Sequence, residues 1–279
     1  MKVIKNTLQM QKIALKYIKD GDEVGLVPTM GALHEGHISL IARSVKSNDI
    51  TIVSIFVNPM QFDPNEDYLK YPRPVRKDLE ICKKNYVDYV FMPSVNDMFP
   101  VEHKTFLEVK FLQDILCGAF RANHFKGVAT VVVKLFNISC ADRAYFGMKD
   151  LQQLKIIERM TKDLNFKTKI IPCQIVREKN GLALSSRNSY LSVEERNLSV
   201  NISKILKEAA QDFKNKNLNA VMKNAVNKLK EIYGSKIDYA EIINFNDLSP
   251  VDKHVKKVVF AVAVWIGKTR LIDNIVMTK

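Results

Sequence analysis

Apolar positions in the first two-thirds of the chain follow two patterns, short continuous runs and helical spacing. The runs are typical of parallel strands whose two faces are both covered. Five such strands are predicted, at Val24–Pro28, Thr51–Val57, Tyr89–Met92, Arg143–Phe146 and Lys167–Pro172. Helices are predicted in the first twenty residues, at His37–Ser47, Val75–Asn85 and Gly127–Phe136, and from about Lys149 onward. This alternation of strand and helix predicts a doubly wound α/β domain.

The pattern changes after about Val176. Ser192 and Glu195 have the spacing of a capping box, which would open a long amphipathic helix. The apolar face of that helix would carry Leu198, Ile202, Ile205, Ala209 and Phe213. A second amphipathic helix follows, then strand-like segments at Ile237–Ile243 and Val258–Trp265. We therefore expect a larger domain over residues 1–176 and a smaller α+β domain over residues 177–279, with two helices and a small antiparallel sheet.

Composition adds one unusual property, the charge. Hydrophobic residues make up 47% and charged residues 26% of the 279 positions, so a folded chain with a substantial core is expected. The formal net charge of +13 would suit a nucleic-acid surface or attraction for an anionic metabolite. The basic clusters Lys214–Lys216 and Lys253–Lys257 are short, and no recognisable nucleic-acid module accompanies them. A composition bias spread over solvated faces is favoured, and no specific nucleic-acid partner is expected.

Cysteine spacing and hydropathy indicate the compartment. Cys82, Cys117, Cys140 and Cys173 show no CxxC spacing and no histidine at metal-ligand spacing, so they fit isolated thiols in a reducing environment. No stretch approaches the ~20 apolar residues that span a bilayer. We expect a cytoplasmic protein that does not enter a membrane.

The most informative segment is the glycine-bearing loop Pro28-Thr-Met-Gly-Ala-Leu-His34-Glu-Gly-His37, which follows the first predicted buried strand. Such a loop places backbone N–H groups and a helix N-terminus at the carboxyl edge of the sheet, where phosphates bind. His34 and His37 would add imidazole donors that stabilise charge on a phosphate. Two alternatives stay open: half of a metal site, although no third ligand is apparent, or a cap of the helix. Gly267-Lys-Thr lacks the glycine that a P-loop would need at Val262.

The second segment is Leu184-Ser-Ser-Arg187-Asn188, at the expected domain junction. The hydroxyls of Ser185 and Ser186 and the guanidinium of Arg187 are suited to hold a triphosphate. Taken alone, the segment is more typical of a surface turn. In an α/β chain that also contains H-x-G-H, it resembles the second signature of the nucleotidylyltransferase superfamily, better known as a Lys-Met-Ser-Lys-Ser loop.

Two further segments carry polar side chains near predicted strand ends. In Phe146-Gly-Met-Lys149-Asp150-Leu-Gln-Gln153, Lys149 could neutralise phosphate, Asp150 would suit the helix dipole, and Gln153 could reach a small polar substrate. The alternative is an ordinary helix N-terminus. In Phe56-Val-Asn-Pro-Met-Gln61-Phe62, the Gln61 amide would lie on an apolar wall, as in a pocket for a branched hydroxy acid. The competing interpretation is a buried loop.

Taken together, the segments resemble the pantoate–β-alanine ligase family over essentially the whole chain. The matching stretches are VPTMGALHEGH, SIFVNPMQF, YPR, NHFKGVATVV, FGMKDLQQL, LSSRNSYLS and GKTRLIDN. The resemblance implies a Rossmann-like N-terminal domain, a smaller C-terminal lid domain and a homodimer. It also implies two steps: the carboxylate of (R)-pantoate attacks the α-phosphate of Mg-ATP to give pantoyl adenylate and pyrophosphate, and the amine of β-alanine then displaces AMP.

The resemblance also implies residue roles. The expected ATP contacts are Met30, Gly31, Ala32, Leu33, His34, Glu35, Gly36, His37, Gly147, Met148, Lys149, Asp150, Val176, Leu184, Ser185, Ser186 and Arg187. His37, His34 and Lys149 are the expected catalytic residues. Gln61 and Gln153 are expected to bind pantoate, and Gln61 also to face β-alanine. Arg121 matches an arginine of the family, without an assigned role.

The chain departs from the family pattern at three positions. Leu184 stands in place of a methionine, and Met148 in place of a polar residue. Lys77 precedes Asp78 where the family commonly has an acidic pair near the metal. Because lysine cannot ligate Mg²⁺, Asp78 is the single expected metal ligand, acting alone or through water.

Overall fold

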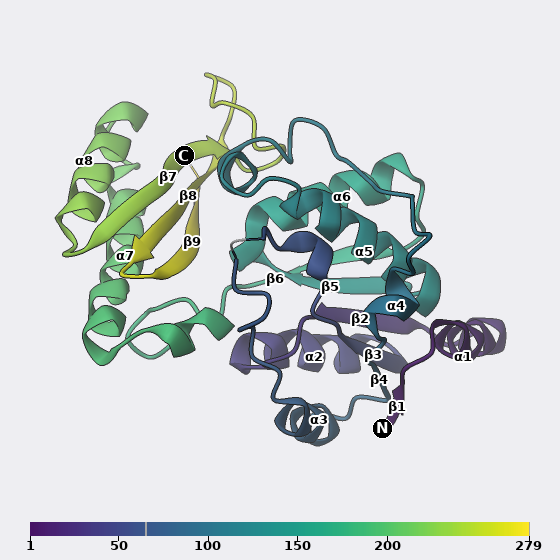
Figure 1. Ribbon diagram of the computed structural model, residues 1–279. Coiled ribbons are helices and arrows are strands. Elements are labelled where there is room, and N and C mark those ends of the chain that lie inside the picture. The colour runs from purple at the N-terminus through teal and green to yellow at the C-terminus, as the bar shows by residue number, and fades with distance from the viewer. Residues whose placement is uncertain (65, 279) are drawn as a thin grey trace.

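The larger sheet of the protein has six parallel strands. The computed structural model describes residues 1–64 and 66–278. The strand order is β1-β4-β3-β2-β5-β6, and every recorded pairing in this sheet is parallel (Figure 1). The strands are β1 Lys2–Ile4, β2 Val24–Thr29, β3 Ile50–Ile55, β4 Tyr89–Phe91, β5 Arg143–Gly147 and β6 Lys169–Cys173. The chain runs outward from β2 on one side and from β5 on the other, so the topological switch point lies between β2 and β5.

Helices cover both faces of this sheet, as a doubly wound fold requires (Figure 1). The helices are α1 Thr7–Asp20, α2 Glu35–Ser47, α3 Val75–Lys84, the short α4 Val95–Met98, α5 His124–Ser139 and α6 Leu151–Asp163. Successive strand residues alternate between the two faces. Leu26 packs in the core that contains residues of α1, α5 and α6, whereas Val27 packs with residues of α2 and α3. The predicted α/β fold class is therefore confirmed.

The C-terminal part forms an antiparallel sheet in the order β7-β8-β9. Its elements are α7 Val193–Asp212, α8 Leu218–Glu231, β7 Ser235–Asn244, β8 Lys257–Ile266 and β9 Thr269–Thr278. Along β8, Phe260 and Val262 pack against α7 and α8, whereas Ala261 and Ala263 belong to the core of the larger sheet. The central strand is thus covered on both faces. The small α+β domain is present, and the boundary at residues 176 and 177 stays a prediction.

Short 3₁₀ turns connect several of these elements close to strand ends. They are η1 Pro59–Gln61, η2 Leu116–Ala119, η3 Met148–Asp150 and η4 Ser186–Tyr190. The predicted capping box is present, since Ser192 Oγ accepts from Glu195 N and Glu195 Oε2 accepts from Ser192 N. No helix within residues 1–64 and 66–278 has the length and apolar content needed to cross a membrane.

Two strands were not predicted. The first residues form the edge strand β1 rather than the start of a helix, and α1 begins after the N-cap Asn6. With three residues, β1 is too short to show an alternating pattern. Strand β9 was missed because Asp273 and Asn274 interrupt its apolar alternation. Both are buried, and both bind polar groups outside the C-terminal sheet.

Candidate active site

A cavity of about 240 Å³ opens at the carboxyl edge of the parallel sheet. Strand β2 pairs with β3 along its whole length, but its recorded pairing with β5 stops at Leu26–Ala144. The two strands therefore separate toward their carboxyl ends, beside the switch point. Thr29 and Met30 at the end of β2, and Gly147 at the end of β5, line the cavity. This is the position where open α/β sheets bind their ligands.

Both histidines of the loop after β2 cap helix α2 and also line the cavity. His34 Nδ1 accepts the Gly36 N–H at 3.1 Å, and His37 Nδ1 accepts the His34 N–H at 3.3 Å. The two rings lie 4.1 Å apart, tilted by 40°. Because each Nδ1 is an acceptor, the hydrogen of each neutral ring sits on Nε2. No hydrogen bond within residues 1–64 and 66–278 uses either Nε2.

The surroundings keep these rings neutral. Burial and, to a smaller extent, the nearby Lys149 lower the pKa of His34 to about 4, although Asp150 opposes the shift. Burial, His34 and Lys149 together lower the pKa of His37 to about 3. At neutral pH each ring therefore presents an Nε2–H donor without a positive charge. A metal site and a helix cap were the two alternatives for these histidines. The Nδ1 atoms form the helix cap, and the Nε2 atoms stay available for a ligand.

Gly36 is required by this arrangement. A Cβ at position 36 would lie 2.8 Å from His34 Cε1 and 2.9 Å from His34 Nδ1. Those distances are shorter than a carbon can approach without displacing the ring. The glycine between the two histidines thus lets the His34 imidazole fold back over the first turn of α2.

Asp78, the predicted metal ligand, holds the same loop from α3. Its Oδ2 accepts from Ala32 N at 2.9 Å, and its Oδ1 accepts from Leu33 N at 2.8 Å. The residue is only 1% exposed and does not line the cavity. Burial raises the pKa of Asp78, although both hydrogen bonds oppose that shift. Each carboxylate oxygen therefore accepts one backbone N–H, so Asp78 holds the loop, and its role as a magnesium ligand stays a prediction. Lys77 is exposed on α3.

Gln61 is presented to the cavity by a network of neighbouring groups. Asn58 Nδ2 donates to Gln61 Oε1 and to Gly127 O, at 3.1 Å each. Gln61 Nε2 lies 2.9 Å from Met30 Sδ. A Cβ at Gly127 would lie 2.3 Å from Met60 O, so only glycine lets α5 approach η1 this closely. Sequence reasoning placed Gln61 beside apolar groups, and the cavity wall around it includes Phe56 and Val128.

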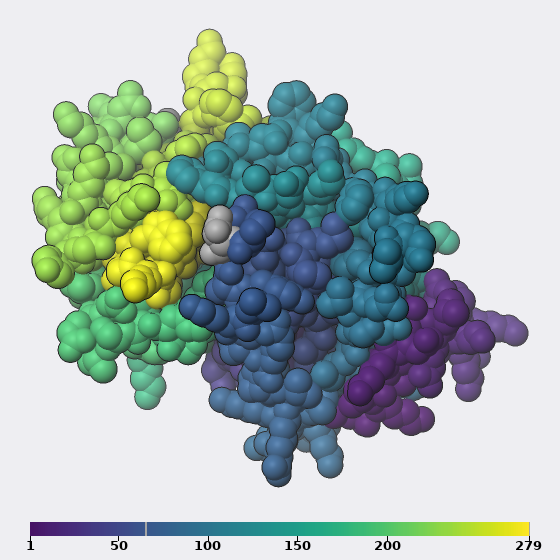
Figure 2. Space-filling model, viewed as in Figure 1, coloured from purple at the N-terminus to yellow at the C-terminus, as the bar shows by residue number. Residues whose placement is uncertain are grey.

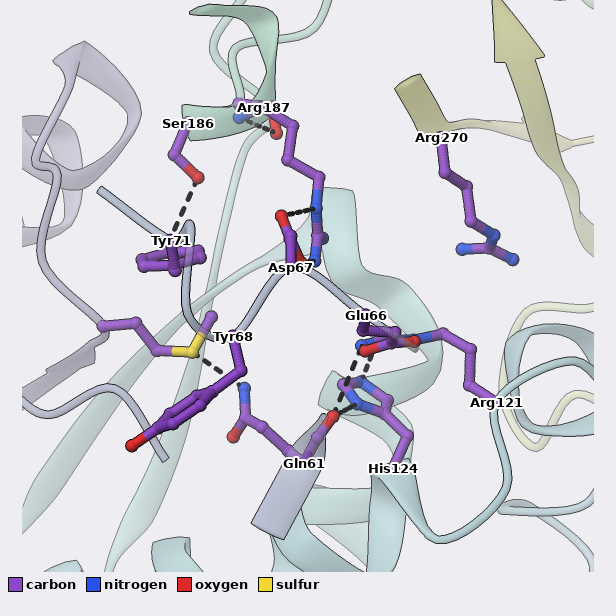
Figure 3. Close-up of polar contacts among 12 residues, drawn as sticks. Gln61, Glu66, Asp67, Tyr68, Tyr71, Arg121, His124, Ser186, Arg187 and Arg270 are labelled. Atoms are coloured by element: carbon purple, nitrogen blue, oxygen red, sulfur yellow. Dashed lines mark hydrogen bonds and ion pairs between the residues drawn. The ribbon is translucent and has the colours of Figure 1, made fainter. Parts of the chain in front are cut away.

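The loop between η1 and α3 contributes acidic partners to two arginines (Figure 3). Glu66 accepts from Arg121 Nη2 at 2.6 Å, and Asp67 accepts from Arg187 Nη2 at 2.9 Å. Tyr71 Oη lies 3.2 Å from Ser186 Oγ. The contacts of Asp67 and Tyr71 join the loop to the segment after β6, and the two surfaces adjoin in Figure 2, whereas Glu66 joins the loop to the segment before α5. Sequence analysis missed Glu66 and Asp67, which lie 55 and 120 residues from their partners.

His124 is a further cavity residue that sequence analysis did not select. Arg121 Nη1 lies 3.0 Å from His124 Nε2, and His124 Nδ1 lies 2.7 Å from Gln61 O. Because a guanidinium can only donate, Nε2 accepts and the ring hydrogen sits on Nδ1. Burial, aided by Arg121, lowers the pKa of His124 to about 3. The ring thus links Arg121 to the backbone of Gln61. It lies within the matching stretch NHFKGVATVV, which was the available signal.

The turn after β5 is held from the C-terminal domain. Asn274 Nδ2 donates to Met148 O at 2.9 Å and to Lys149 O at 3.0 Å. The Lys149 and Asp150 side chains line the cavity, as does Gln153. Gln152 instead points into the protein, where its amide bonds Cys117 N and Leu112 O. Gln153 therefore faces this cavity, whereas the Gln152 amide holds the turn η2 and the segment before it.

The sequence profile of the family described as pantoate–β-alanine ligase matches residues 2–276. The chain belongs to the pantoate–β-alanine ligase family. It is 80% identical over 279 residues to the pantothenate synthetase of Endomicrobium trichonymphae, covering 100% of this chain and 99% of the relative. It is 53% identical to that of Sulfurihydrogenibium sp., covering 99% of each.

Solved structures of this family have the same fold as this ligase. The pantothenate synthetase of Thermus thermophilus matches with a TM-score of 0.93 at 35% identity, covering 99% of each chain. The pantoate–β-alanine ligase of Francisella tularensis, described as complexed with beta-gamma ATP and β-alanine, matches with a TM-score of 0.82 at 38% identity. That match covers 99% of this chain and 97% of the other. The chain is thus an enzyme that forms a carbon–nitrogen bond.

The cavity of this ligase collects most, though not all, of the residues predicted to contact ATP. Those that line it are Met30, His34, Gly36, His37, Gly147, Lys149, Asp150, Val176, Leu184, Ser185, Ser186 and Arg187. Those that do not line it are Gly31, Ala32, Leu33, Glu35 and Met148. Leu33 packs in the core between the sheet, α2 and α3, and Met148 packs against the core on the opposite face. Gln61 and Gln153, predicted to bind pantoate, both line the cavity.

Proposed function

We propose that this ligase uses ATP to activate the carboxylate of (R)-pantoate as an adenylate and then couples it to β-alanine. The observation that carries the proposal is the pair of neutral Nε2–H donors on His34 and His37, which line one cavity with Lys149 at the switch point of the sheet. Such a site offers hydrogen bonds and positive charge to the phosphates of a nucleotide.

In the first step, a carboxylate oxygen of pantoate forms a bond to the α-phosphorus of ATP, and the bond to the β-phosphate breaks. Pyrophosphate leaves with the electron pair. Negative charge develops on the α-phosphate oxygens, where His37, His34 and Lys149 would stabilise it. Ser185, Ser186 and Arg187 would hold the departing phosphates. In the second step, the β-alanine nitrogen loses a proton and bonds the carboxyl carbon, and AMP leaves.

The apolar part of the cavity supports pantoate as the acid. Phe56, Val128 and Val131 line it together with the amides of Gln61 and Gln153. Apolar walls suit the branched carbon skeleton of pantoate, and the amides can bind its hydroxyl and carboxylate groups. The adenylate would therefore be held at its acyl end by α5, η1 and α6.

We expect magnesium to bind only together with ATP, as Mg-ATP. Across residues 1–64 and 66–278, no group of three or more His, Cys, Asp or Glu side chains could hold a metal ion. Asp78 is a poor candidate, because it is buried outside the cavity and each of its oxygens accepts a backbone N–H. Phosphate oxygens and water would therefore supply most of the ligands that Mg²⁺ prefers.

A homodimer and a cytoplasmic location belong to the same proposal, by analogy with the family. Sedimentation equilibrium of the full chain tests the dimer directly. A mass equal to one chain at all concentrations would contradict it.

A pyrophosphate-release assay tests the activity. We expect release with Mg-ATP and pantoate, followed by AMP release when β-alanine is added. Release that depends on an amino acid instead of pantoate would contradict the substrate assignment and would favour another adenylate-forming reaction.

A further inference from the structure

Strand β9 lies at the junction of the two domains, and its side chains alternate between its two faces (Figure 1). Ile272 and Val276 pack against the core of the larger sheet, whereas Leu271 packs with residues of α7 and α8. Asn274 belongs to the first face and Asp273 to the second. These two polar side chains are buried, at 3% and 5% exposed, so each must find hydrogen-bond partners inside the protein.

The Asn274 amide fixes the turn that carries Lys149. Its Nδ2 donates to Met148 O at 2.9 Å and to Lys149 O at 3.0 Å. A carbonyl can only accept, so the NH₂ group of the amide faces both of them. These carbonyls belong to the peptide groups on either side of the Lys149 Cα. One side chain therefore holds both peptide groups, and it sets the direction in which the Lys149 side chain enters the cavity.

Asp273 holds a second segment of the cavity wall from the other face of β9. Its two oxygens accept from Arg177 Nη1 at 2.6 Å and from Arg177 Nη2 at 2.8 Å. Arg177 Nη1 also donates to Gly181 O at 3.2 Å, and Leu184 N donates to Val176 O at 3.0 Å. These bonds close a hairpin whose two ends, Val176 and Leu184, line the cavity. The hairpin leads directly into the serines and the arginine proposed to hold the departing phosphates.

We propose that Asp273 and Asn274 together are a positioning element for adenylation. Neither residue lines the cavity, so both act through the segments that they hold. Because adjacent residues of one strand bind both segments, β9 sets where the Lys149 ammonium lies relative to the phosphate-holding segment. The C-terminal domain thus takes part in the first step of the reaction. This inference rests on the proposed function, because it assigns positioning residues to that reaction.

A double-mutant cycle tests the link between Asn274 and Lys149. Asn274→Ala removes both donors, so we expect the rate of pyrophosphate release in a single turnover to fall roughly tenfold to hundredfold, as for a catalytic group displaced by about 1 Å. In a Lys149→Gln background the same change should cost less than about threefold, because the group that Asn274 positions is already absent. A contact that only joins the domains would lower the rate by the same factor in both backgrounds.

Asn244→Ala is the matched control. Asn244 lies on β7 of the same sheet, donates to Ser249 Oγ at 3.3 Å and does not line the cavity. Its loss should leave the rate unchanged in both backgrounds. If Asn274→Ala does not fold, Asn274→Ser provides the second variant. It keeps a single donor, so its rate should lie below that of wild type, again with a smaller loss in the Lys149→Gln background.

The Asp273 side is tested by Asp273→Asn, which keeps the size of the side chain but removes the charge that pairs with Arg177. We expect the KM for ATP to rise roughly threefold to tenfold with a smaller change in kcat, since the loosened segment holds the phosphates. Asn274→Ala should show the opposite division, with the larger effect on kcat. The reason is that the charge stabilised by Lys149 develops on the α-phosphate only in the transition state.

Four outcomes would overturn the inference. They are an equal loss of rate from Asn274→Ala in the two backgrounds, a wild-type rate in folded Asn274→Ala, a wild-type rate in Lys149→Gln, and the same division between kcat and KM in the Asp273 and Asn274 variants. Each would mean that the pair only joins the two domains. Failure of the proposed function looks different, since the wild-type enzyme would then release no pyrophosphate with pantoate.

Discussion

At the scale of single residues, the hydrogen-bond partner of each histidine decides what the ring can offer a ligand. His34 and His37 accept backbone N–H groups through Nδ1, so both keep a hydrogen on Nε2. His124 has the opposite tautomer, because Arg121 donates to its Nε2. The first two rings can therefore donate into the cavity, whereas the third supports the backbone of Gln61.

We predict that His37→Asn lowers the rate of pyrophosphate release by roughly 10²–10³, the loss seen when one donor to a developing oxyanion is removed. This variant keeps an acceptor near the position of Nδ1, so the helix cap is retained. His37→Gln places an amide N–H near the position of Nε2 and should recover part of the rate. Single-turnover kinetics with saturating ATP and pantoate measure both effects.

His254→Asn is the control for this series, because His254 is exposed far along the chain, before β8. It should react at the wild-type rate. If His37→Asn did the same with its fold intact, His37 would not be a catalytic residue.

At the scale of secondary-structure elements, contacts from α3 and α5 set the two loops that carry the candidate ligands. Asp78 on α3 binds the loop after β2 across a sequence separation of 45 and 46 residues. Gly127 on α5 allows close contact with η1. Asp78 and Gly127 do not line the cavity themselves, but each holds a segment that does.

We predict that Asp78→Asn destabilises the loop after β2. An amide has one acceptor oxygen, so one of the two N–H groups would face an NH₂ donor, at a cost of about 1–3 kcal/mol. Urea unfolding measures the loss of stability, and the KM for ATP should rise because the loop carries His34 and His37. The magnesium dependence at fixed ATP should stay unchanged.

Lys77→Glu is the matched control on the neighbouring residue of α3. Because Lys77 is exposed, this change should alter neither the stability nor the magnesium requirement. A lower magnesium requirement in Lys77→Glu, or a much higher one in Asp78→Asn, would instead support Asp78 as a metal ligand.

We predict that Gly127→Ala raises the KM for pantoate more than the KM for ATP. The added Cβ would lie 2.3 Å from Met60 O and 2.7 Å from Gln61 N, so η1 must move away from α5. Overpacking of this kind typically costs about 1–3 kcal/mol. Asn137→Ala, on the exposed side of α5, should leave both constants unchanged. Equal increases in both KM values would indicate a general folding defect instead.

At the scale of the whole molecule, buried neutral histidines link stability to pH. His34, His37 and His124 have pKa values of about 4, 3 and 3, whereas an unfolded histidine titrates near 6.5. Below about pH 6.5 the unfolded chain therefore binds more protons than the folded one. The free energy of unfolding must fall as the pH decreases through this range, down to the folded pKa values.

We predict a lower urea midpoint at about pH 5 than at about pH 7, with an unchanged slope. The folded protein lowers the pKa of Asp67 from its ordinary value of 3.8. Its contribution to the free energy of unfolding is therefore lost mostly below pH 3.8, and it changes little between about pH 5 and about pH 7. His124→Gln should reduce the pH dependence, and His254→Gln should not. Equal midpoints at the two pH values would mean that the rings are protonated in the folded protein.

The sequence by itself determined the fold class and the principal loops of the site. Apolar runs and helical spacing record which side chains are buried, and burial is a local property that each segment expresses separately. The loops after β2 and β5, and the segment that contains Arg187, could be identified because they follow strands or a change of pattern. Their residues line one cavity because parallel strands bring their carboxyl ends to one edge.

Only the tertiary structure decided how these loops are held and what completes the site. The pairing of Arg121 with Glu66, and of Arg187 with Asp67, depends on the path of a loop that no periodicity describes. The same is true of the hydrogen bonds from Ala32 N and Leu33 N to Asp78, which hold the loop after β2. Charge and hydrogen-bond partners come from segments distant in sequence, and their geometry exists only after the chain has folded.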